Sequence, residues 1–487
     1  MLEPRLIEYH LSKVQKEIGE KLTLANTYFR LVKPIEENLK RYSRLGNKSN
    51  QRLLLDIIFA PLKISLEILK SLGISLIRFR ESASFEVPEG FRHQKIFVSH
   101  YTHAQLPSRP DVFFDVLPTK EDLIFYHNNT LLKRAKILDT LRQGEYRANV
   151  LITTKSLGLR QTLIIQASNL KISLIMLVAA LKTQCFTHVE RQILTEAAIS
   201  QVSRQTLANQ INLKRLDSLL TLNNAASLII TLEGHAYESL YIDLIHTKYP
   251  DTRLLAFQHA PIVPEQFGLM KNLLKLKAND VILCSGDITR DFFASLGLCA
   301  SVQLLGSPKW RPISLESKQS YPITVLGAAE GTLESLESFS QLFQGLNALN
   351  LDLKLILRVH PALSIQESSK VLSRLEFGRT LVLSNRTLEE DLKESHFCIY
   401  RSSAVAIEGL RFGVFPLYFN PTGDQGLNPL FFAKLEVPVF RNLHEIGELF
   451  LNLRQMGSRA TINQNEELRK IGATYYSKLD PSALNRL

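Results

Sequence analysis

Several features that would identify a class of protein are missing from this chain of 487 residues. Its four cysteines are scattered and form no CxxC pair, so neither a zinc site nor a disulfide scaffold is indicated. No zinc finger, basic zipper or RNA-binding aromatic signature is present. There is no internal repeat of about 20 to 50 residues, so a solenoid is not expected. The chain is therefore read as a globular protein in a reducing compartment.

Long apolar runs are also scarce. An early acid, Glu3, and the lack of an apolar segment behind it argue against a secretory signal. The longest apolar runs are residues 53–66, interrupted by Asp56 and Lys63, and residues 172–181. The second run is shorter than the about 20 residues that span a bilayer. We therefore expect no transmembrane helix and a cytoplasmic protein.

The charge is unbalanced, with a formal net charge of +11 that is spread along the chain. Such an excess attracts acidic partners. Its spread favours an enzyme with an anionic donor at an anionic membrane surface over a nucleic-acid binder. We expect no nucleic-acid partner and peripheral association with the inner membrane. The amphipathic run 53–66 could lie on that membrane or pack on its own protein.

The pattern of apolar residues predicts an α/β protein with two Rossmann-like domains. Residues 1–90 are expected to form a helical extension. Residues 91–300 are expected to form the N-terminal Rossmann-like domain with a helical insertion, and residues 301–487 the C-terminal Rossmann-like domain. The strands expected in the first domain are 95–99, 123–126, 149–153, 227–232, 254–258 and 281–285. Those expected in the second are 302–305, 323–326, 355–359, 381–383, 397–400, 415–419 and 437–440.

Polar side chains follow two expected strands of the second domain. His360 and Pro361 end one strand, and Ser402 and Ser403 follow another. In open parallel sheets, ligands bind in the crevice outside the carboxyl ends of the strands. An imidazole and two hydroxyls at that edge could hold one phosphate. Singly, the motifs have ordinary explanations, since proline stops a strand and serine caps a helix.

The first domain has a comparable edge. One expected strand is followed by Glu233 and Gly234, and the next ends in Gln258 and His259. Glycine lets the backbone turn sharply, which leaves the carboxylate pointing into the crevice. There it could act as a general base for a sugar hydroxyl. Glu233 could equally be a cap or first-turn acid stabilised by a helix dipole.

Three further residues extend the candidate nucleotide site. Gly327 belongs to a small-residue turn between strand and helix, which would let a phosphate approach helix amides. Arg358 alternates with His360 along one strand, so both would point to the same side. A surface or ion-pair role for Arg358 is as consistent with the sequence. Glu408 would contact a ribose or lie at the surface.

In this order, the motifs resemble bacterial surface-polysaccharide glycosyltransferases of the two-Rossmann GT-B type, those of capsule and lipopolysaccharide biosynthesis. The stretch from Glu233 to Glu238 is similar to an acid-Gly pattern of these proteins, and residues 111–118 are similar to an early segment of them. The His-Pro and Ser-Ser elements are similar to those of bacterial sialyl- and polysialyltransferases, capsular Kdo transferases and glycerophosphotransferases that use CDP-glycerol.

The resemblance implies a GT-B-like architecture with two Rossmann-like domains facing a cleft, residues 91–300 being the acceptor domain and residues 301–487 the nucleotide-sugar-binding domain. It also implies a transferase that moves a sugar from a nucleotide-sugar donor, CMP-linked, to a surface glycan or lipid-linked acceptor. Glu233 would be the base of an inverting transfer, and His360 would stabilise the leaving phosphate. No DxD pair ends a strand of the first domain, so neither a metal nor another cofactor is expected. The nucleotide-binding residues implied or expected are Arg358, His360, Ser402, Ser403, Glu408 and Gly327, and those for acceptor or donor sugar are His235, Gln258 and His259.

Two other functions remain open at this point. The same scaffold could transfer glycerophosphate or another phosphoryl-linked unit, and His259 would then also take part. A GT-B-like protein without catalytic activity could bind a glycan or a protein partner.

Overall fold

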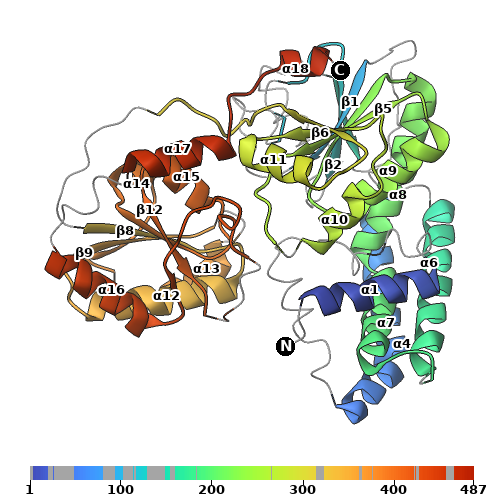
Figure 1. Ribbon diagram of the computed structural model, residues 1–487. Coiled ribbons are helices and arrows are strands. Elements are labelled where there is room, and N and C mark those ends of the chain that lie inside the picture. The colour runs from blue at the N-terminus through green and yellow to red at the C-terminus, as the bar shows by residue number, and fades with distance from the viewer. Residues whose placement is uncertain are drawn as a thin grey trace. The chain divides into compact units, whose positions relative to one another are not determined.

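The structure is a computed structural model, shown in Figure 1. It describes residues 4–19, 26, 49–79, 94–101, 113–114, 117–128, 149–153, 159–182, 184–264, 266–313, 323–360, 363, 365–375, 377–421, 423, 427–456 and 465–486. The chain divides into two compact units. The first comprises residues 1–259, 266–283 and 297–303, and the second comprises residues 260–265, 284–296 and 304–487.

The first sheet has seven strands in the order β3-β2-β1-β4-β5-β6-β7. All pairs from β3 to β5 are parallel. Its central strands β4 and β5 are mostly apolar and are buried on both faces, as is usual in parallel sheets. The strands are β1 (Lys95–Tyr101), β2 (Leu123–Asn128), β3 (Asn149–Thr153), β4 (Ser227–Thr231), β5 (Arg253–Gln258), β6 (Val281–Cys284) and β7 (Ser301–Leu304).

The position of β7 corrects one expectation. The strand predicted at residues 302–305 was assigned to the second domain, and it instead forms the edge of the first sheet beside β6. The backbone amide of Ser301 donates to the carbonyl of Asp280, just before β6. Its sequence cannot reveal this choice, because a short strand next to a proline-rich loop can pair with either sheet. The second sheet therefore starts at Ile323.

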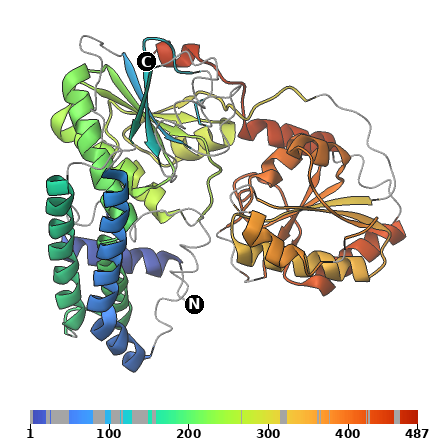
Figure 2. The ribbon, with the colours of Figure 1, turned by 180° about the vertical axis from the view of Figure 1, so that it is seen from behind.

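A layer of helices belongs to the first unit, and Figure 2 shows it from behind. Helices α1 (Pro4–Ile18), α4 (Asn50–Phe79), α6 (Leu159–Leu181) and α7 (His188–Gln201) share one hydrophobic core, and α8 (Arg204–Asn223) leads back to β4. The predicted helical extension and helical insertion thus pack against each other. The carboxylate of Glu190 links them further, because the Lys13 ammonium lies 3.0 Å from it.

Helix α6 is longer than its apolar run suggested. It has 23 residues, so its length and composition would suffice to cross a membrane, although half of its most apolar window is buried inside the protein. The apolar run at residues 172–181, which by itself is too short to span a bilayer, is therefore part of a longer helix. Ser173 lies within that apolar run and Gln166 lies before it. Both are buried and donate to backbone carbonyls, Ser173 to one in α7 and Gln166 to that of the residue after α7.

The second sheet has six parallel strands in the order β10-β9-β8-β11-β12-β13. Hydrophobic clusters cover both of its faces. The strands are β8 (Ile323–Ala328), β9 (Leu353–Arg358), β10 (Leu381–Leu383), β11 (Phe397–Tyr400), β12 (Phe415–Phe419) and β13 (Val439–Phe440). The helices are α12 (Leu333–Ala348), α13 (Ile365–Leu372), α14 (Leu388–Glu394), α15 (Val405–Arg411), α16 (Leu443–Met456), α17 (Asn465–Tyr475) and α18 (Ser482–Asn485).

Two Rossmann-like α/β domains and an N-terminal helical segment are therefore present, as predicted for a GT-B-like chain. Among the described residues, helices follow β3, β4 and β5 of the first sheet and β8 to β11 of the second, and they return the chain to the next strand. The carboxyl ends of the strands consequently form one edge per sheet. Binding residues in open α/β sheets gather at such edges.

Candidate active site

Glu233 lies at the carboxyl edge of the first sheet, between two histidines. It comes two residues after β4, and its side chain is 3% exposed. One carboxylate oxygen, Oε1, is 2.7 Å from Nε2 of His259, which follows β5. The other, Oε2, is 3.2 Å from Nε2 of His235. Each oxygen therefore has its own imidazole, an arrangement that fixes the orientation of the carboxylate.

A second glutamate, Glu238, holds the loop that carries Glu233. Its buried carboxylate accepts hydrogen bonds from the backbone amides of Glu233, Gly234 and His235, at 2.9, 2.7 and 2.9 Å. The side-chain amide of Asn272 donates to the same carboxylate at 3.0 Å. Glu238 is the first-turn acid of α9 (Ala236–Lys248). The role of first-turn acid, which was considered for Glu233, therefore belongs to Glu238. Glu233 remains available to a ligand at the carboxyl edge of the sheet.

Gly234 is required at the turn between them. Its φ angle is +93°, in the region that residues with a side chain rarely adopt. A Cβ atom there would lie 2.3 Å from the backbone nitrogen of Leu269, in α10 (Phe267–Leu273). The glycine therefore serves both the sharp turn and the close approach of α10, which brings Asn272 to Glu238.

Two histidines that the sequence analysis did not select complete the same edge. His100 and His127 lie near the ends of β1 and β2, with ring centroids 4.8 Å apart. The ring of Tyr237 is 4.9 Å from His100 and 5.1 Å from His127, and it stacks on His235. The four strands β1, β2, β4 and β5 thus contribute one cluster of imidazoles, of which His235 and His259 contact the carboxylate of Glu233.

Phe113 joins this cluster from the segment 111–118. Its ring meets His259 edge-on, with centroids 4.5 Å apart, and lies 6.1 Å from His100. Gln258, the last residue of β5, is buried beside His259. The predicted residues Glu233, His235 and His259 are therefore in contact, and Gln258 adjoins them.

Burial makes His127 neutral. Loss of water, and to a smaller extent the nearby His235, lowers the pKa of His127 to about 3. The phenol of Tyr241, 2.6 Å from its Nε2, can then donate to that nitrogen. Tyr241 is buried too, and burial raises the pKa of its hydroxyl well above the ordinary value, which keeps the proton on the donor.

This neutral histidine predicts a loss of stability in acid. Below its ordinary pKa of 6.5, His127 binds a proton in the unfolded chain but not in the folded one, so stability falls as pH decreases. At about 1.4 kcal/mol per pH unit, the free energy of unfolding should drop by about 2 kcal/mol from pH 7 to pH 5. Urea unfolding at both pH values measures it.

The matched control is the double variant His127→Phe/Tyr241→Phe. It removes both partners of the hydrogen bond while keeping ring shape, so it should fold with little loss of stability. Between pH 7 and pH 5, its free energy of unfolding should fall by about 2 kcal/mol less than that of the parent. An equal pH dependence in the two proteins would contradict a buried neutral His127.

At the carboxyl edge of the second sheet, Glu330 organises the residues around Ser402. Glu330 follows β8 and is buried, and its Oε1 accepts the backbone amide of Ser402 at 2.7 Å. Its Oε2 accepts the hydroxyl of Ser335, in the first turn of α12. His360 follows β9 and is exposed, while Ser402 and Ser403 are partly buried after β11. These strands flank β8, so His360 and the two serines lie at one edge.

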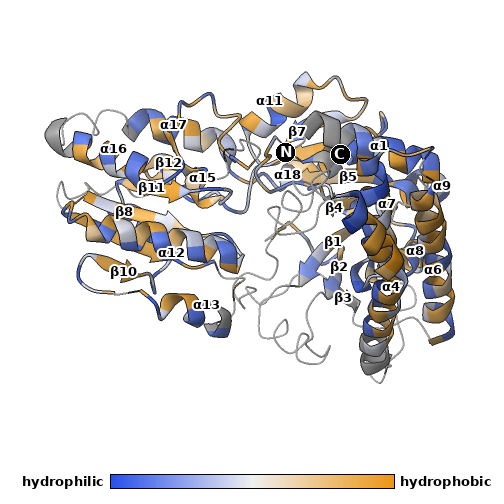
Figure 3. Cartoon of the chain, turned by 90° about the horizontal axis from the view of Figure 1, so that it is seen from below, coloured by the Kyte–Doolittle hydropathy of each residue, from blue (hydrophilic) through white to orange (hydrophobic). Residues whose placement is uncertain are grey.

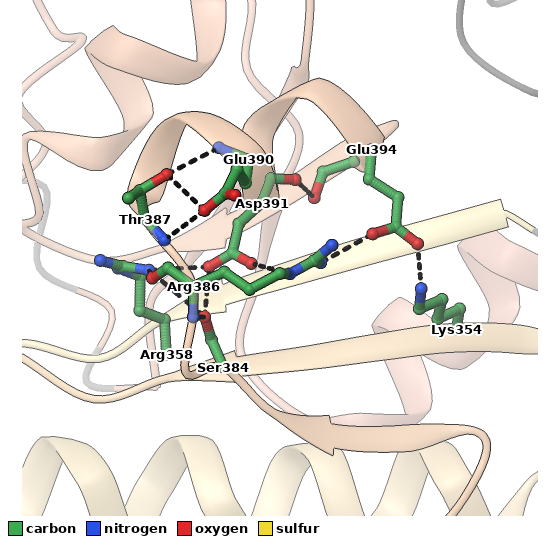
Figure 4. Close-up of polar contacts among 9 residues, drawn as sticks. Lys354, Arg358, Ser384, Arg386, Thr387, Glu390, Asp391 and Glu394 are labelled. Carbon is green, nitrogen blue, oxygen red and sulfur yellow. Dashed lines mark hydrogen bonds and ion pairs between the residues drawn. The ribbon is translucent and has the colours of Figure 1, made fainter.

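Arg358 contacts an acid instead of facing an open site. Its Nη1 is 2.8 Å from Oδ2 of the buried Asp391 and 2.9 Å from the carbonyl oxygen of Arg386, as Figure 4 shows. Ser384 donates to the same carboxylate oxygen at 2.5 Å. The ion-pair role considered for Arg358 thus agrees with the structure. The alternation rule places side chains on a face of a strand but cannot show which neighbour they meet.

Another arginine at this edge is better placed for an anion. Arg401 directly follows β11 and precedes Ser402. Its guanidinium Nε is buried, and within the part of the chain that the structure describes no hydrogen-bond partner reaches that atom. The sequence analysis did not select Arg401, because an arginine before Ser402 and Ser403 carries no specific signal by itself.

Gly327 has a packing role that differs from the expected one. It lies within β8, and a Cβ atom there would come 2.3 Å from Cζ of Phe343 on α12. Its missing side chain makes room for this ring in the core. The prediction that Gly327 lets a phosphate approach helix amides is corrected accordingly, because the strand continues one residue beyond it.

Glu408 supports a loop. Its carboxylate Oε2 is 3.0 Å from Nη1 of Arg411, and Arg411 donates onward to the carbonyls of Lys309 and Arg311. This chain of contacts ties the proline-rich segment 308–312 to α15. The side chain is 18% exposed, so Glu408 is not a fully exposed surface glutamate.

Among the residues that the structure describes, no group of three or more His, Cys, Asp or Glu side chains has the arrangement of a metal site. The chemistry of the histidine cluster around Glu233 is therefore considered as proton transfer. A buried carboxylate beside two imidazoles can accept a proton from a hydroxyl that reaches it.

Comparison with protein-family models and with curated proteins finds no match. Solved structures with a similar arrangement include MnaA from S. aureus with UDP, at 10% identity and a TM-score of 0.44, covering 81% of this chain and 94% of that one. UDP-GlcNAc 2-epimerase from Neisseria meningitidis has 11% identity and a TM-score of 0.40, covering 80% and 98%. The glycosyltransferase SnogD from Streptomyces nogalater has 9% identity and a TM-score of 0.39, covering 81% and 98%.

Proposed function

We propose that this chain is a glycosyltransferase that moves a sugar from a nucleotide-sugar donor, CMP-linked, to a hydroxyl of a surface glycan or lipid-linked acceptor. One observation carries the proposal. Buried Glu233 ends a Rossmann strand with each of its oxygens against an imidazole, on a loop whose three amides are held by Glu238. A carboxylate that is held in one orientation at a binding edge can act as a general base.

In the proposed reaction, Glu233 takes the proton of the acceptor hydroxyl as its oxygen attacks the anomeric carbon of the donor sugar. The bond from that carbon to the phosphate oxygen breaks, and the phosphate leaves with the electron pair. Attack from the opposite side inverts the configuration. The negative charge on the leaving phosphate needs donors and a cation. His360, Ser402, Ser403 and Arg401 would supply them without a metal ion.

The first test is binding of free nucleotides. A ligand that binds only the folded protein raises its melting temperature. Among CMP, CDP, UDP and GDP, CMP is expected to give the largest shift, and Ser402→Ala/Ser403→Ala should remove most of it. The control Ser369→Ala/Ser373→Ala changes two exposed serines of the same unit and should keep it. If no nucleotide shifts the midpoint, or the first double variant responds fully, the nucleotide site is not at these serines.

A second enzyme function rests on the contact between His259 and Glu233. This 2.7 Å pair could equally remove a proton for transfer of a glycerophosphate unit from CDP-glycerol. Purified protein given CDP-glycerol and CMP-linked sugars in parallel separates the two functions. Release of CMP from CDP-glycerol, with none from the sugar donors, would replace the first proposal.

A further inference from the structure

Helix α4 is apolar on two opposite sides. One side enters the core shared with α7, through Leu53, Ile57, Ala60 and Ile64. The other is exposed to solvent, with relative exposures from 49% to 66%, through Leu55, Phe59, Leu62, Leu66 and Leu69. With about 100° of rotation per residue, the exposed five share an arc of about 80° opposite the buried side. Core packing therefore accounts for only half of the apolar surface of α4.

Helix α6 repeats this arrangement. It packs against both α4 and α7, and its buried side joins the same core through Ile172, Met176, Leu177 and Ala180. Its outer side exposes Ile164, Leu174, Val178 and Leu181 at 49% to 57%. Figure 3 shows both helices largely in the colour of hydrophobic residues. An open groove of about 720 Å³ adjoins this side of α6, lined also by Ile18 of α1 and by Phe186.

Basic residues border these exposed faces. On α4, Arg52, Lys63 and Lys70 lie on one flank of the exposed apolar arc, about 60° to 80° from its centre, and Lys63 and Lys70 pair there with Asp56 and Glu67. On α6, Arg160 and Lys171 lie within the exposed face, and Leu159–Leu181 contains no acid. Long basic side chains can bury their methylene stems in an apolar layer and keep the charge at its surface.

We propose that the outer faces of α4 and α6 dock on an anionic lipid bilayer. Apolar helix faces bordered by Lys and Arg bind at the boundary of headgroups and acyl chains, and anionic lipids add attraction for the cations. A second copy of the chain fits less well. A two-fold contact uses the same patch on both copies, so Arg160 and Lys171 of both copies would be buried in one interface. This inference does not depend on the proposed transfer reaction.

The test is co-sedimentation of the full chain with vesicles, at low and high salt. Binding is expected to vesicles of phosphatidylcholine with phosphatidylglycerol, and to be weaker with phosphatidylcholine alone. The variant Phe59→Ser/Leu62→Ser/Leu66→Ser should lower the partition coefficient at least about tenfold, because three apolar side chains no longer enter the bilayer. The variant Arg160→Gln/Lys171→Gln should reduce the preference for anionic vesicles.

The matched control is Leu222→Ser/Leu274→Ser, which changes two leucines of the same unit that are 66% and 76% exposed but lie outside these helices. It should bind vesicles like the parent. All variants should keep the parent's melting temperature. Lack of binding to either vesicle, or undiminished binding of the triple variant, would overturn the proposal. So would light scattering that shows a dimer which the triple variant splits, since the faces would then meet in a second copy.

Discussion

Replacing Glu233 with glutamine is expected to lower the turnover of sugar transfer about 1,000-fold, within the range that general-base catalysis contributes. The amide has almost the same shape and can still hydrogen-bond to His235 and His259, but it cannot accept the hydroxyl proton. Nucleotide binding should be unchanged. The measurement is the release of nucleotide from the donor in the presence of acceptor. The donor is the one whose nucleotide raises the melting temperature most.

Two controls separate loss of the base from loss of structure. Glu337→Gln changes an exposed acid of α12 and should leave turnover as it is. His259→Gln keeps Glu233 but removes the closer of its two imidazoles, so a smaller loss is expected than for Glu233→Gln. If Glu233→Gln retains more than about a tenth of the parent turnover, a base that contributes at least a hundredfold cannot be Glu233.

Replacing Glu238 with alanine is expected to lower the free energy of unfolding by about 3–5 kcal/mol. Hydrogen bonds to a charged group contribute about 1.5–3 kcal/mol each, and removing the acceptor leaves buried amides unpaired. Here three amides of one loop and the side chain of Asn272 lose their common acceptor. Urea unfolding followed by circular dichroism measures the change.

The control is Glu390→Ala. Glu390 has the same first-turn position in α14, where its carboxylate accepts the backbone amide of Thr387, but it is exposed to water. Water can replace it, so a much smaller loss is expected. Similar losses in the two variants would mean that Glu238 acts only as an ordinary capping acid. The Glu238→Ala protein should also lose transfer activity, because the loop with Glu233 is no longer held.

These two glutamates show where sequence reasoning succeeded. Glu233 was selected because an acid and a glycine followed an apolar β-branched run, and that local pattern is repeated in the structure as β4, a turn and α9. The strands of both sheets were found in the same way, since burial on both faces of a parallel sheet leaves continuous apolar runs. Glu238 was visible only as part of a motif, because its partners are amides of the preceding turn.

The histidines show where sequence reasoning ended. His100 and His127 also follow apolar runs, so the rule that selected His259 would have found them had it been applied to every strand. That rule could not predict that His100 and His127 contact each other. Strand order in a sheet is set by packing of distant segments, and β1 pairs with β4 across more than a hundred residues that include the helical insertion.

What local patterns decided, then, was the kind of element and the edge at which polar residues collect, because hydrophobic periodicity and strand ends are properties of neighbouring residues. Tertiary packing decided the partners. It turned Arg358 toward Asp391, placed Phe343 over Gly327, joined β7 to the first sheet and left one side of α4 uncovered. Each of these outcomes depends on contacts between residues far apart in the chain, and the local sequence does not determine such contacts.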